Sequence, residues 1–251
     1  IVGVRHEGTP EGKFQTVNDV EVYIATPKVD YPKDKAILYL PDAFGHRLNN
    51  TLLLADDYAC NGSYTAVPDY LNGGPVAPDA FSKPGFSLQQ WINNQRSAQA
   101  RPPLDKAIIW FKENGVKEFG ATGYCFGARY VFDLAFDGVL KASVISHPSL
   151  FKVPDMEKYV KQTKAPLLIN NCIHDTQFPH EAQAKTDVLF GEKDAPMYRR
   201  VYSAGCRHGF AVHADLSDLK VKSGKEGALW LLLNGPWSVC RWMTVPRSAI
   251  L

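Results

Sequence analysis

The sequence predicts an α/β fold in which a mainly parallel, twisted sheet carries helices on both faces. Continuous apolar runs, such as residues 36–40 and 165–170, are typical of strands that are covered on both sides. Helical patterns separate these runs at short spacing, as parallel strands require. In addition, an apolar run that ends at Gly123 is joined by a very short turn to a helical pattern at 128–135. Ligands of such folds bind at the carboxyl ends of the strands.

Each expected element follows from its residue pattern and from the residues that stop it. The loop 72–85 is rich in glycine and proline and is too long for a plain connector, which favours a functional role. Asn50 and Thr51 are suited to cap a helix, whereas Pro102 and Pro103 are expected to interrupt one. The expected strands are 20–27, 36–40, 64–70, 116–123, 142–146, 165–170 and 197–202. The expected helices are 50–60, 87–100, 104–115, 128–135, 156–162, 179–190 and 227–233.

Length and composition predict one domain over residues 1–251, with a core at about 20–233 and no large lid domain. The tail 235–251 has apolar residues without a clean period, so we expect it on the surface or at a subunit contact. The net charge is +2 and both signs are scattered, which gives no reason to expect nucleic acid or a membrane as a partner. We expect a monomer or a homodimer that binds a small molecule.

Five cysteines at irregular spacings form neither a disulfide framework nor a metal-binding pattern, so we expect no metal and no other cofactor. Their odd number favours a reducing compartment, and residues 1–11 lack the apolar centre of a signal peptide. No stretch reaches the ~18 apolar residues that a membrane span needs. The sequence therefore predicts a cytoplasmic protein.

The segment Gly123-Tyr124-Cys125-Phe126-Gly127 has the pattern of a nucleophile elbow, the strand-turn-helix unit of the α/β-hydrolase fold. In such a turn the central residue takes a strained backbone conformation, and the flanking glycines avoid collisions of a Cβ atom. Cys125 would gain the positive end of the following helix, and the N–H of Phe126 would face a developing oxyanion. The alternative is a buried structural thiol, since free cysteine is among the most buried residue types.

A nucleophilic thiol needs a base and a third group that orients the base. Asp175 and His208 fit these roles, because each lies in a loop just past an expected strand end, on the sheet edge that carries Cys125. Their order along the chain, nucleophile then acid then histidine, is the one that this fold uses. The sequence therefore predicts a triad of these three residues.

Each of these assignments has an alternative. His208 could order its own loop, and Asp175 could be a turn or cap residue. His213 is a rival base, and His147 or His174 could line the pocket.

The predicted chemistry is hydrolysis of a small ester or lactone through a thioester. His208 would take the proton of Cys125, the thiolate would attack the carbonyl carbon, and water would release the acyl group with His208 again as base. The N–H groups of Phe126 and Ala43 would hold the oxyanion. A cysteine nucleophile favours activated carbonyls, such as lactones and enol esters, over amides.

Four stretches carry the motifs of a known family. They are Gly-Tyr-Cys-Phe-Gly-Ala-Arg-Tyr (123–130), His-Pro-Ser (147–149), His-Asp-Thr-Gln-Phe-Pro (174–179) and His-Gly-Phe-Ala-Val (208–212). These motifs resemble the dienelactone hydrolase family, a single-domain branch of the α/β-hydrolases that uses cysteine at the elbow. The resemblance covers about 20–233 and implies Cys125, Asp175 and His208 as the triad. It also implies that Asp42 replaces an acidic residue that contacts the resting nucleophile, although a turn or cap role is as fitting for Asp42.

Two arginines that this family uses to hold the carboxylate of dienelactone are missing, since residues 68–73 and 208–212 contain none. Loss of such a clamp removes most of the selectivity for an anion. We therefore expect an apolar or aromatic substrate instead of dienelactone, although each aromatic candidate could instead belong to the core. The expected substrate-binding residues are Asp42, Phe44, Tyr70, Trp91, His147 and Phe210, with Phe81 as a further wall.

Two other classes of function stay open on the sequence. A non-hydrolytic tailoring enzyme or a ligand-binding protein could reuse the pocket, as the missing arginines suggest. A redox-responsive protein would need a second thiol near Cys125. Cys172 and Cys206 are the candidates, because they lie in the loops that carry Asp175 and His208.

Overall fold

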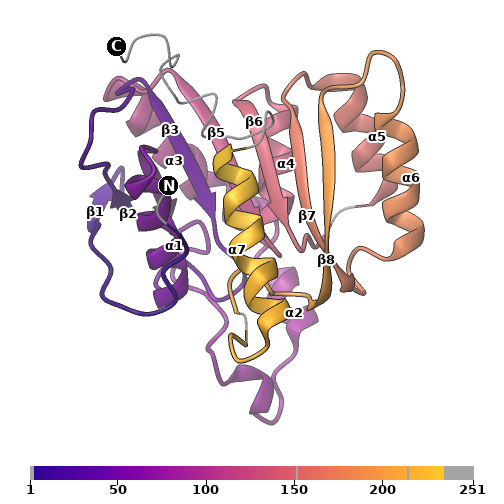
Figure 1. Cartoon of the computed structure of the whole chain (residues 1–251). Helices are drawn as coiled ribbons and strands as arrows, with labels where there is room; N and C mark the ends of the chain where they lie inside the picture. The colour runs from indigo at the N-terminus through magenta and orange to yellow at the C-terminus, as the bar shows by residue number, and fades with distance from the viewer. Residues whose placement is uncertain (1–2, 151, 214, 235–251) are drawn as a thin grey trace.

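The computed structural model describes residues 3–150, 152–213 and 215–234, and its centre is an eight-stranded sheet (Figure 1). The strand order is β1-β2-β4-β3-β5-β6-β7-β8. β2 pairs antiparallel with both β1 and β4, and all other neighbours are parallel, so the predicted α/β architecture is confirmed. The strands are β1 Lys13–Val17, β2 Val20–Ala25, β3 Lys35–Leu40, β4 Thr65–Pro68, β5 Glu118–Tyr124, β6 Leu140–Ser146, β7 Leu167–His174 and β8 Tyr198–Arg207.

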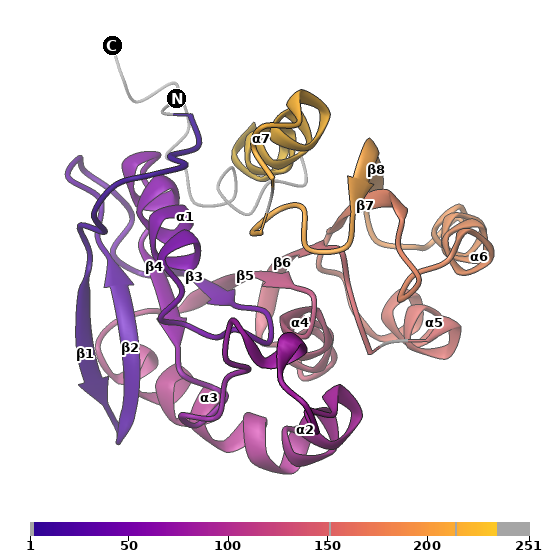
Figure 2. The ribbon, with the colours of Figure 1, turned by 90° about the horizontal axis from the view of Figure 1, so that it is seen from below.

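Helices cover both faces of the sheet (Figure 2). α1 and α7 pack on one face, where the core includes Ile37 and Tyr39, and α3 and α4 pack on the other, where it includes Ala36, Leu38 and Leu40. Because alternate residues of β3 enter two different cores, this strand is apolar without alternation. The helices are α1 Asn49–Cys60, the 3-10 turn η1 Ala80–Ser82, α2 Leu88–Asn94, α3 Ser97–Glu113, α4 Gly127–Phe136, α5 Val153–Gln162, α6 His180–Phe190 and α7 Leu219–Asn234.

The segment between β4 and α3, with η1 and α2, extends past the carboxyl end of the sheet, at the bottom of Figure 1. This is the long loop that the sequence marked as too long for a connector. The carbonyl of Ala43, in the loop after β3, accepts a hydrogen bond from the N–H of Val76 at 2.8 Å. The extended segment is therefore anchored to a loop at the same edge.

Helix α3 differs from the prediction, because Pro102 and Pro103 lie inside it. The interruption falls earlier, at Gln95 and Arg96, between α2 and α3. Both prolines are near the amino end of α3, and Pro103 is buried with Leu104, so packing offsets the backbone hydrogen bonds that the prolines cannot make.

Strands β7 and β8 extend well past their predicted carboxyl ends, and β1 was not predicted. β8 continues to Arg207 through Gly205, which has a φ of 78°, and the register against β7 shifts between Cys172 and His174. The glycine that predicted a loop instead allows an irregular ladder. β7 likewise continues to His174. β1 is an edge strand that is mostly exposed, so no apolar alternation marks it in the sequence.

Helix α1 begins without the cap that the sequence predicted. Leu48 holds the N-cap position, with no side-chain hydrogen bond, and Thr51 is fully buried. The side-chain amide of Asn50 donates instead to the carbonyl of Val212 at 2.9 Å. Asn50 thus ties the start of α1 to the loop after β8, which carries His208.

The predicted tail 235–251 lies outside the described residues. Within the part of the chain that is described, no helix has both the length and the apolar character that crossing a bilayer requires.

Candidate active site

Cys125 and Phe126 form the turn between β5 and α4, and Cys125 has a φ of 48°. This left-handed conformation is strained for a residue with a side chain. The glycines on either side are required by space. A Cβ on Gly123 would lie 2.6 Å from the side chain of Val131, and one on Gly127 would overlap the carbonyl of Leu40. The turn therefore has the geometry that the sequence pattern predicted.

His208 and Asp175, which are 33 positions apart in sequence, meet at the same edge. Nδ1 of His208 lies 3.0 Å from Oδ1 of Asp175, and the Asp175 side chain has no exposed surface. An ionised carboxylate only accepts hydrogen bonds, so we assign the Nδ1 proton to the histidine, which donates it to Asp175. The N–H of Gln177 donates to the same carboxylate oxygen at 3.0 Å and fixes it further.

The protonation of His208 reflects its two neighbours. Burial of the ring opposes the charged form, but hydrogen bonds to Asp175 and to Cys125 outweigh it and raise the pKa of His208 to about 10. The imidazole is thus held between a carboxylate on one side and a thiol on the other.

Ser149 is a neighbour that the sequence analysis did not assign to the site. Its Oγ lies 3.4 Å from Sγ of Cys125 and 3.5 Å from Nε2 of His208. Its N–H donates to the carbonyl of Cys125 at 3.1 Å. The available signal was its position, three residues past the end of β6, which is the strand beside β5.

The two expected oxyanion donors lie near the turn. Gly127 sits against the carbonyls of Leu40 and Pro41, so the loop after β3, which contains Ala43, passes beside the start of α4. No backbone hydrogen bond among the described residues uses the N–H of Ala43 or of Phe126. Their role as oxyanion donors stays a prediction.

The contact with the nucleophile that the family resemblance implied for Asp42 stays a prediction. Oδ1 of Asp42 accepts the N–H of Phe44 at 2.9 Å, and its Oδ2 lies 2.5 Å from Nε2 of His213. The hydrogen-bond partners of this buried carboxylate are thus a loop amide and a histidine. The ring of His213, the rival base, also meets the ring of Phe44 edge-on, with centroids 4.6 Å apart.

The expected aromatic walls fall into two groups. Phe44 and Trp91 are half-buried, Phe81 is 59% exposed, and the Phe44 and Phe81 rings are 6.2 Å apart. By contrast, Tyr70 is fully buried and its hydroxyl donates to the carbonyl of Pro41 at 2.5 Å. Tyr70 is therefore a core residue that holds the loop after β3, and we do not retain it as a wall.

Phe210 and His147 are buried as well. His147 has 0% exposure and a φ of 37°, and neither ring nitrogen has a hydrogen-bond partner among the described residues. Its ring packs against those of His208 at 5.0 Å and Phe210 at 5.6 Å. Burial and the nearby charges of His208 and His213 hold the pKa of His147 well below its usual range. We read His147 and Phe210 as packing behind the imidazole of His208 and no longer as substrate-binding residues.

The candidate resolving thiols are poorly suited to redox chemistry. Cys172 is buried, and burial together with Asp175 raises its pKa to about 12. Cys206 is buried too, and burial raises its pKa. Since the thiolate is the reactive form, neither sulfur favours exchange with Cys125. Among the described residues, no group of three or more His, Cys, Asp or Glu side chains is arranged to hold a metal ion.

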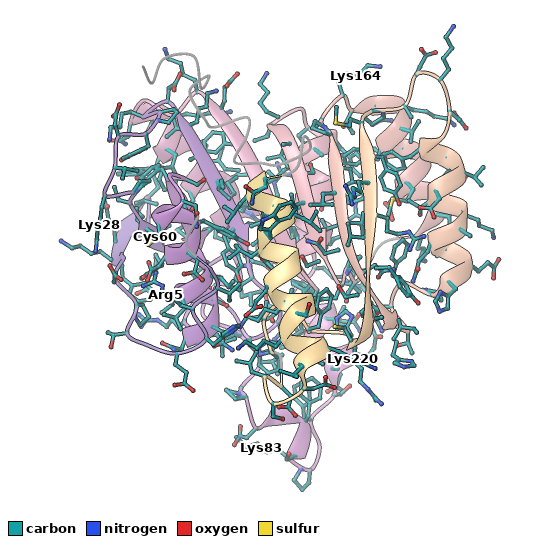
Figure 3. The ribbon with its side chains drawn as sticks, viewed as in Figure 1. Arg5, Lys28, Cys60, Lys83, Lys164 and Lys220 are labelled. Carbon is teal, nitrogen blue, oxygen red and sulfur yellow. The ribbon has the colours of Figure 1, made fainter. Side chains whose placement is uncertain are left out.

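A second polar region lies away from this edge, where β1, β2 and α1 enclose a hollow of about 550 Å³. Figure 3 shows Arg5, Lys28 and Cys60 on that side, at the left of the view, whereas Lys220, at the start of α7, lies near the lower centre. The residues that line the hollow include none of the predicted site residues. They are Glu11, Gly12, Lys13, Gln15, Ile24, Thr26, Lys28, Val29, Asp56, Ala59, Cys60 and Tyr64.

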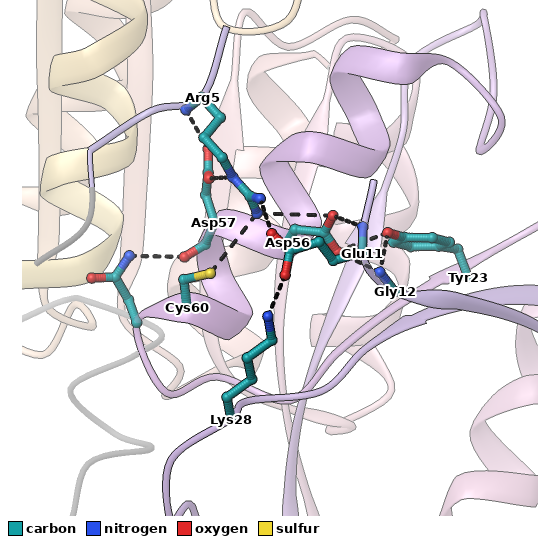
Figure 4. A network of polar contacts seen from close by, with 9 residues as sticks. Arg5, Glu11, Gly12, Tyr23, Lys28, Asp56, Asp57 and Cys60 are labelled. Carbon is teal, nitrogen blue, oxygen red and sulfur yellow. Dashed lines mark hydrogen bonds and ion pairs between the residues drawn. The ribbon is translucent and has the colours of Figure 1, made fainter. Parts of the chain in front are cut away.

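This second region is a network of ion pairs (Figure 4). Arg5 bonds Asp57 at 2.8 Å and Glu11 at 2.6 Å, and Asp56 accepts the hydroxyl of Tyr23 at 2.7 Å. The network fixes the amino-terminal segment on α1. Sγ of Cys60 lies 3.8 Å from Nη2 of Arg5, and a guanidinium cannot accept a proton.

The strand order, the strained turn at Cys125 and the histidine-carboxylate pair at the carboxyl end of the sheet define an α/β-hydrolase. Within that class the chain belongs to the dienelactone hydrolase family, whose sequence model matches residues 20–229. It is therefore a hydrolase of this family.

Curated relatives agree with this assignment. Hydrolase pyvD of Aspergillus violaceofuscus is 31% identical over 231 residues, which cover 90% of this chain and 89% of that protein. Hydrolase tropI of Talaromyces stipitatus is 31% identical over 240 residues, with the same coverage of 90% and 89%. Dienlactone hydrolase 1 of Gibberella moniliformis is 31% identical and covers 87% of this chain and 84% of its own length.

Solved structures share the fold. A crystal structure of a Klebsiella pneumoniae protein has a TM-score of 0.69 at 19% identity and covers 88% of this chain and 97% of that one. A dienelactone hydrolase-like promiscuous phosphotriesterase from metagenomic libraries has a TM-score of 0.63 at 19% identity, with 86% and 90% covered.

Proposed function

We propose that this protein hydrolyses a small ester or lactone with Cys125 as nucleophile, His208 as base and Asp175 as the group that orients His208. The observation that carries the proposal is the single row of contacts through His208. Its Nδ1 lies 3.0 Å from Oδ1 of Asp175, and the hydroxyl of Ser149 lies 3.5 Å from its Nε2 and 3.4 Å from Sγ of Cys125.

The first half of the reaction forms a thioester. His208 accepts the proton of Cys125, and the sulfur attacks the carbonyl carbon of the substrate. The carbonyl π electrons move to oxygen, where the N–H groups of Ala43 and Phe126 stabilise the charge. When the tetrahedral intermediate collapses, the C–O bond breaks, and the leaving alcohol takes the proton from His208.

The second half releases the acid. A water molecule enters the space that the alcohol has left, and His208 takes its proton while the water oxygen attacks the thioester carbon. The C–S bond then breaks, and the proton returns from His208 to the sulfur of Cys125. For a lactone the alcohol and the acid are two ends of one product.

The substrate that fits this site best is apolar or aromatic. Phe44, Phe81 and Trp91 gather next to the loop after β3 and leave aromatic surface free, with Phe81 59% exposed. Val212, which stands where the family has one of its clamping arginines, is fully buried. The nearby imidazole of His213 is already paired with Asp42. These features support a neutral ring or chain over a free carboxylate.

The test is hydrolysis by a Cys125→Ala variant. Turnover of 4-nitrophenyl acetate and of a panel of lactones and enol esters should fall by at least about a thousandfold, as when other covalent hydrolases lose their nucleophile. Circular dichroism and the unfolding temperature should stay close to wild type. The matched control is Cys60→Ala, which removes an exposed thiol outside the site and should leave turnover unchanged.

Substantial turnover by folded Cys125→Ala would reject the proposal. So would wild-type protein that binds such compounds without producing any acid, because that result would select the ligand-binding or non-hydrolytic alternative.

A further inference from the structure

Ser149 occupies a position between the two groups that must exchange a proton. Its hydroxyl oxygen is 3.4 Å from Sγ of Cys125 and 3.5 Å from Nε2 of His208. The O···N distance is at the long end for a hydrogen bond, as catalytic bonds often are before a substrate is bound. The side chain of Ser149 therefore contacts both ends of the proposed proton transfer.

The backbone holds Ser149 in this place. Its N–H donates to the carbonyl of Cys125 at 3.1 Å, and the N–H of Cys125 donates to the carbonyl of Ser146, at the end of β6, at 3.1 Å. The loop after β6 and the strained turn are thus joined by two main-chain hydrogen bonds. Ser149 is also only 7% exposed, so bulk water has little access to its hydroxyl.

The side chain of Cys125 has a hydroxyl as its hydrogen-bonding neighbour. Asp42 accepts the N–H of Phe44 and pairs with His213, whereas Sγ of Cys125 lies 3.4 Å from the Ser149 oxygen. A hydroxyl differs from a carboxylate in that it can donate to a thiolate as well as accept from a thiol. The resting sulfur of this chain therefore has a neighbour that supports either protonation state.

We propose that Ser149 relays the proton between Cys125 and His208, which rests on the function proposed above. In the forward direction the S–H bond breaks as the proton moves to the Ser149 oxygen. The Ser149 O–H bond breaks as its own proton moves to Nε2 of His208. Ser149 ends with one O–H bond and no charge, Cys125 is a thiolate and His208 is an imidazolium.

The product state of this relay has a donor for every acceptor. His208 donates through Nδ1 to Asp175 and through Nε2 to Ser149, and Ser149 donates to the Cys125 thiolate. Burial lowers the pKa of the neighbouring His147 ring, so this ring adds no second positive charge beside the pair.

The experiment compares Ser149→Ala with wild type in the rate of Cys125 alkylation by iodoacetamide, followed at a series of pH values by peptide mass spectrometry. Loss of a hydrogen bond to a charged group should lower the rate near pH 7 about tenfold and move the midpoint of its pH dependence upward by about one unit. The second-order constant kcat/KM for 4-nitrophenyl acetate should fall by a similar factor. Ser149→Thr, which keeps the hydroxyl, should restore most of both effects.

The matched control is Ser143→Ala, which removes another buried hydroxyl, from β6. Among the described residues, Ser143 has no hydrogen bond to Cys125 or His208. It should leave the pH dependence of alkylation at its wild-type midpoint. A structural role for Ser149 would change the stability of Ser149→Ala without moving that midpoint.

A second measurement needs no variant. Single-turnover acylation of wild type in mixtures of light and heavy water should show a curved dependence on deuterium fraction, because two protons move together in the relay. A linear dependence, or a Ser149→Ala variant with wild-type midpoint and kcat/KM, would overturn the relay. Either result would leave the proposed hydrolysis intact as long as Cys125→Ala is inactive.

Discussion

Two thiols of the described chain escape full burial, and their surroundings differ in what they can do with a proton. Cys125 lies beside His208, whose pKa is raised to about 10 by a buried carboxylate and by the thiol itself. Cys60 lies 3.8 Å from Nη2 of Arg5, at the end of α1 (Figure 4). A guanidinium stays charged in proteins and cannot accept a proton. Exposure and a nearby cation are therefore not enough to activate a thiol. Activation also needs a base that a third group holds in place.

The backbone conformations of Cys60 and Cys125 differ as well. Cys60 is the last residue of an ordinary helix, whereas Cys125 has a φ of 48° and needs glycine on both sides. Strain of this kind persists only where the surrounding structure enforces it. The local structure around Cys125 is thus specialised for presenting a side chain, and that around Cys60 is specialised for anchoring the amino-terminal segment.

The largest expected effect is a difference in kcat between variants of His208 and of Arg5. His208→Gln should lower kcat for 4-nitrophenyl acetate by about a thousandfold or more, because the variant lacks the proposed base. Arg5→Met should leave kcat of the folded protein within about twofold of wild type, since Arg5 acts only on α1 and its neighbours. Steady-state kinetics on both variants checks the contrast. A strong fall in kcat for folded Arg5→Met would show that the two regions are coupled.

The next effect concerns the glycine after the nucleophile. In Gly127→Ala the new Cβ would overlap the carbonyl of Leu40, and we expect a loss of about 3 kcal/mol of unfolding free energy. The control is Gly227→Ala in α7, where a Cβ meets nothing within 4 Å and helix propensity should add about 0.5–1 kcal/mol. Urea unfolding measures both. Equal stability of the two variants would mean that the turn is not as tight as described.

A smaller loss is expected in the second region. Arg5→Met leaves the carboxylate of Asp57 buried without its partner, and should cost about 2 kcal/mol, less than a fully buried pair because a quarter of Arg5 is exposed. Burial raises the pKa of Asp57 even against the pull of Arg5, so acid neutralises this carboxyl readily. The cost of the substitution should therefore shrink between pH 7 and pH 5. Urea unfolding at the two pH values tests the sign, and a cost that grows in acid would contradict it.

The last prediction compares His208 with its own variants by nuclear magnetic resonance. Asp175 and Cys125 both favour the imidazolium, so the His208 ring should titrate far above 6.5, toward about 10, in wild type. Replacing Cys125 with alanine removes one of these two partners and should lower the pKa of His208. Asp175→Asn should lower it as well. An unchanged titration in Cys125→Ala would separate the imidazole from the thiol.

The sequence was most informative where the structure depends on a few adjacent residues. The elbow could be predicted because Gly123 and Gly127 are demanded by collisions that only glycine avoids. The sheet could be predicted because buried parallel strands are apolar on both faces. The prolines of α3 led to a wrong prediction of a helix break. The burial of Pro103 and Leu104 stabilises the helix there, against the local preference of proline.

Contacts between distant loops could not be predicted in the same way. Ser149 reaches His208 across 59 positions, and His213 reaches Asp42 across 171. Both contacts depend on how the loops after β3, β6 and β8 pack against each other. Nothing in the adjacent residues of Asp42 indicates that its partner is a histidine and not the nucleophile.

The most direct test of the account is to trap the acyl group. Wild-type protein is mixed with 4-nitrophenyl acetate, quenched in acid within milliseconds, digested and sequenced by mass spectrometry. We predict one acetyl group on the peptide that contains Cys125, none on the peptide that contains Cys60, and a longer-lived adduct in His208→Gln wherever the first step still occurs. Acid release with no acetyl group on Cys125 at any quench time, or undiminished release from Cys125→Ala, would contradict the claim that this thiol is the nucleophile.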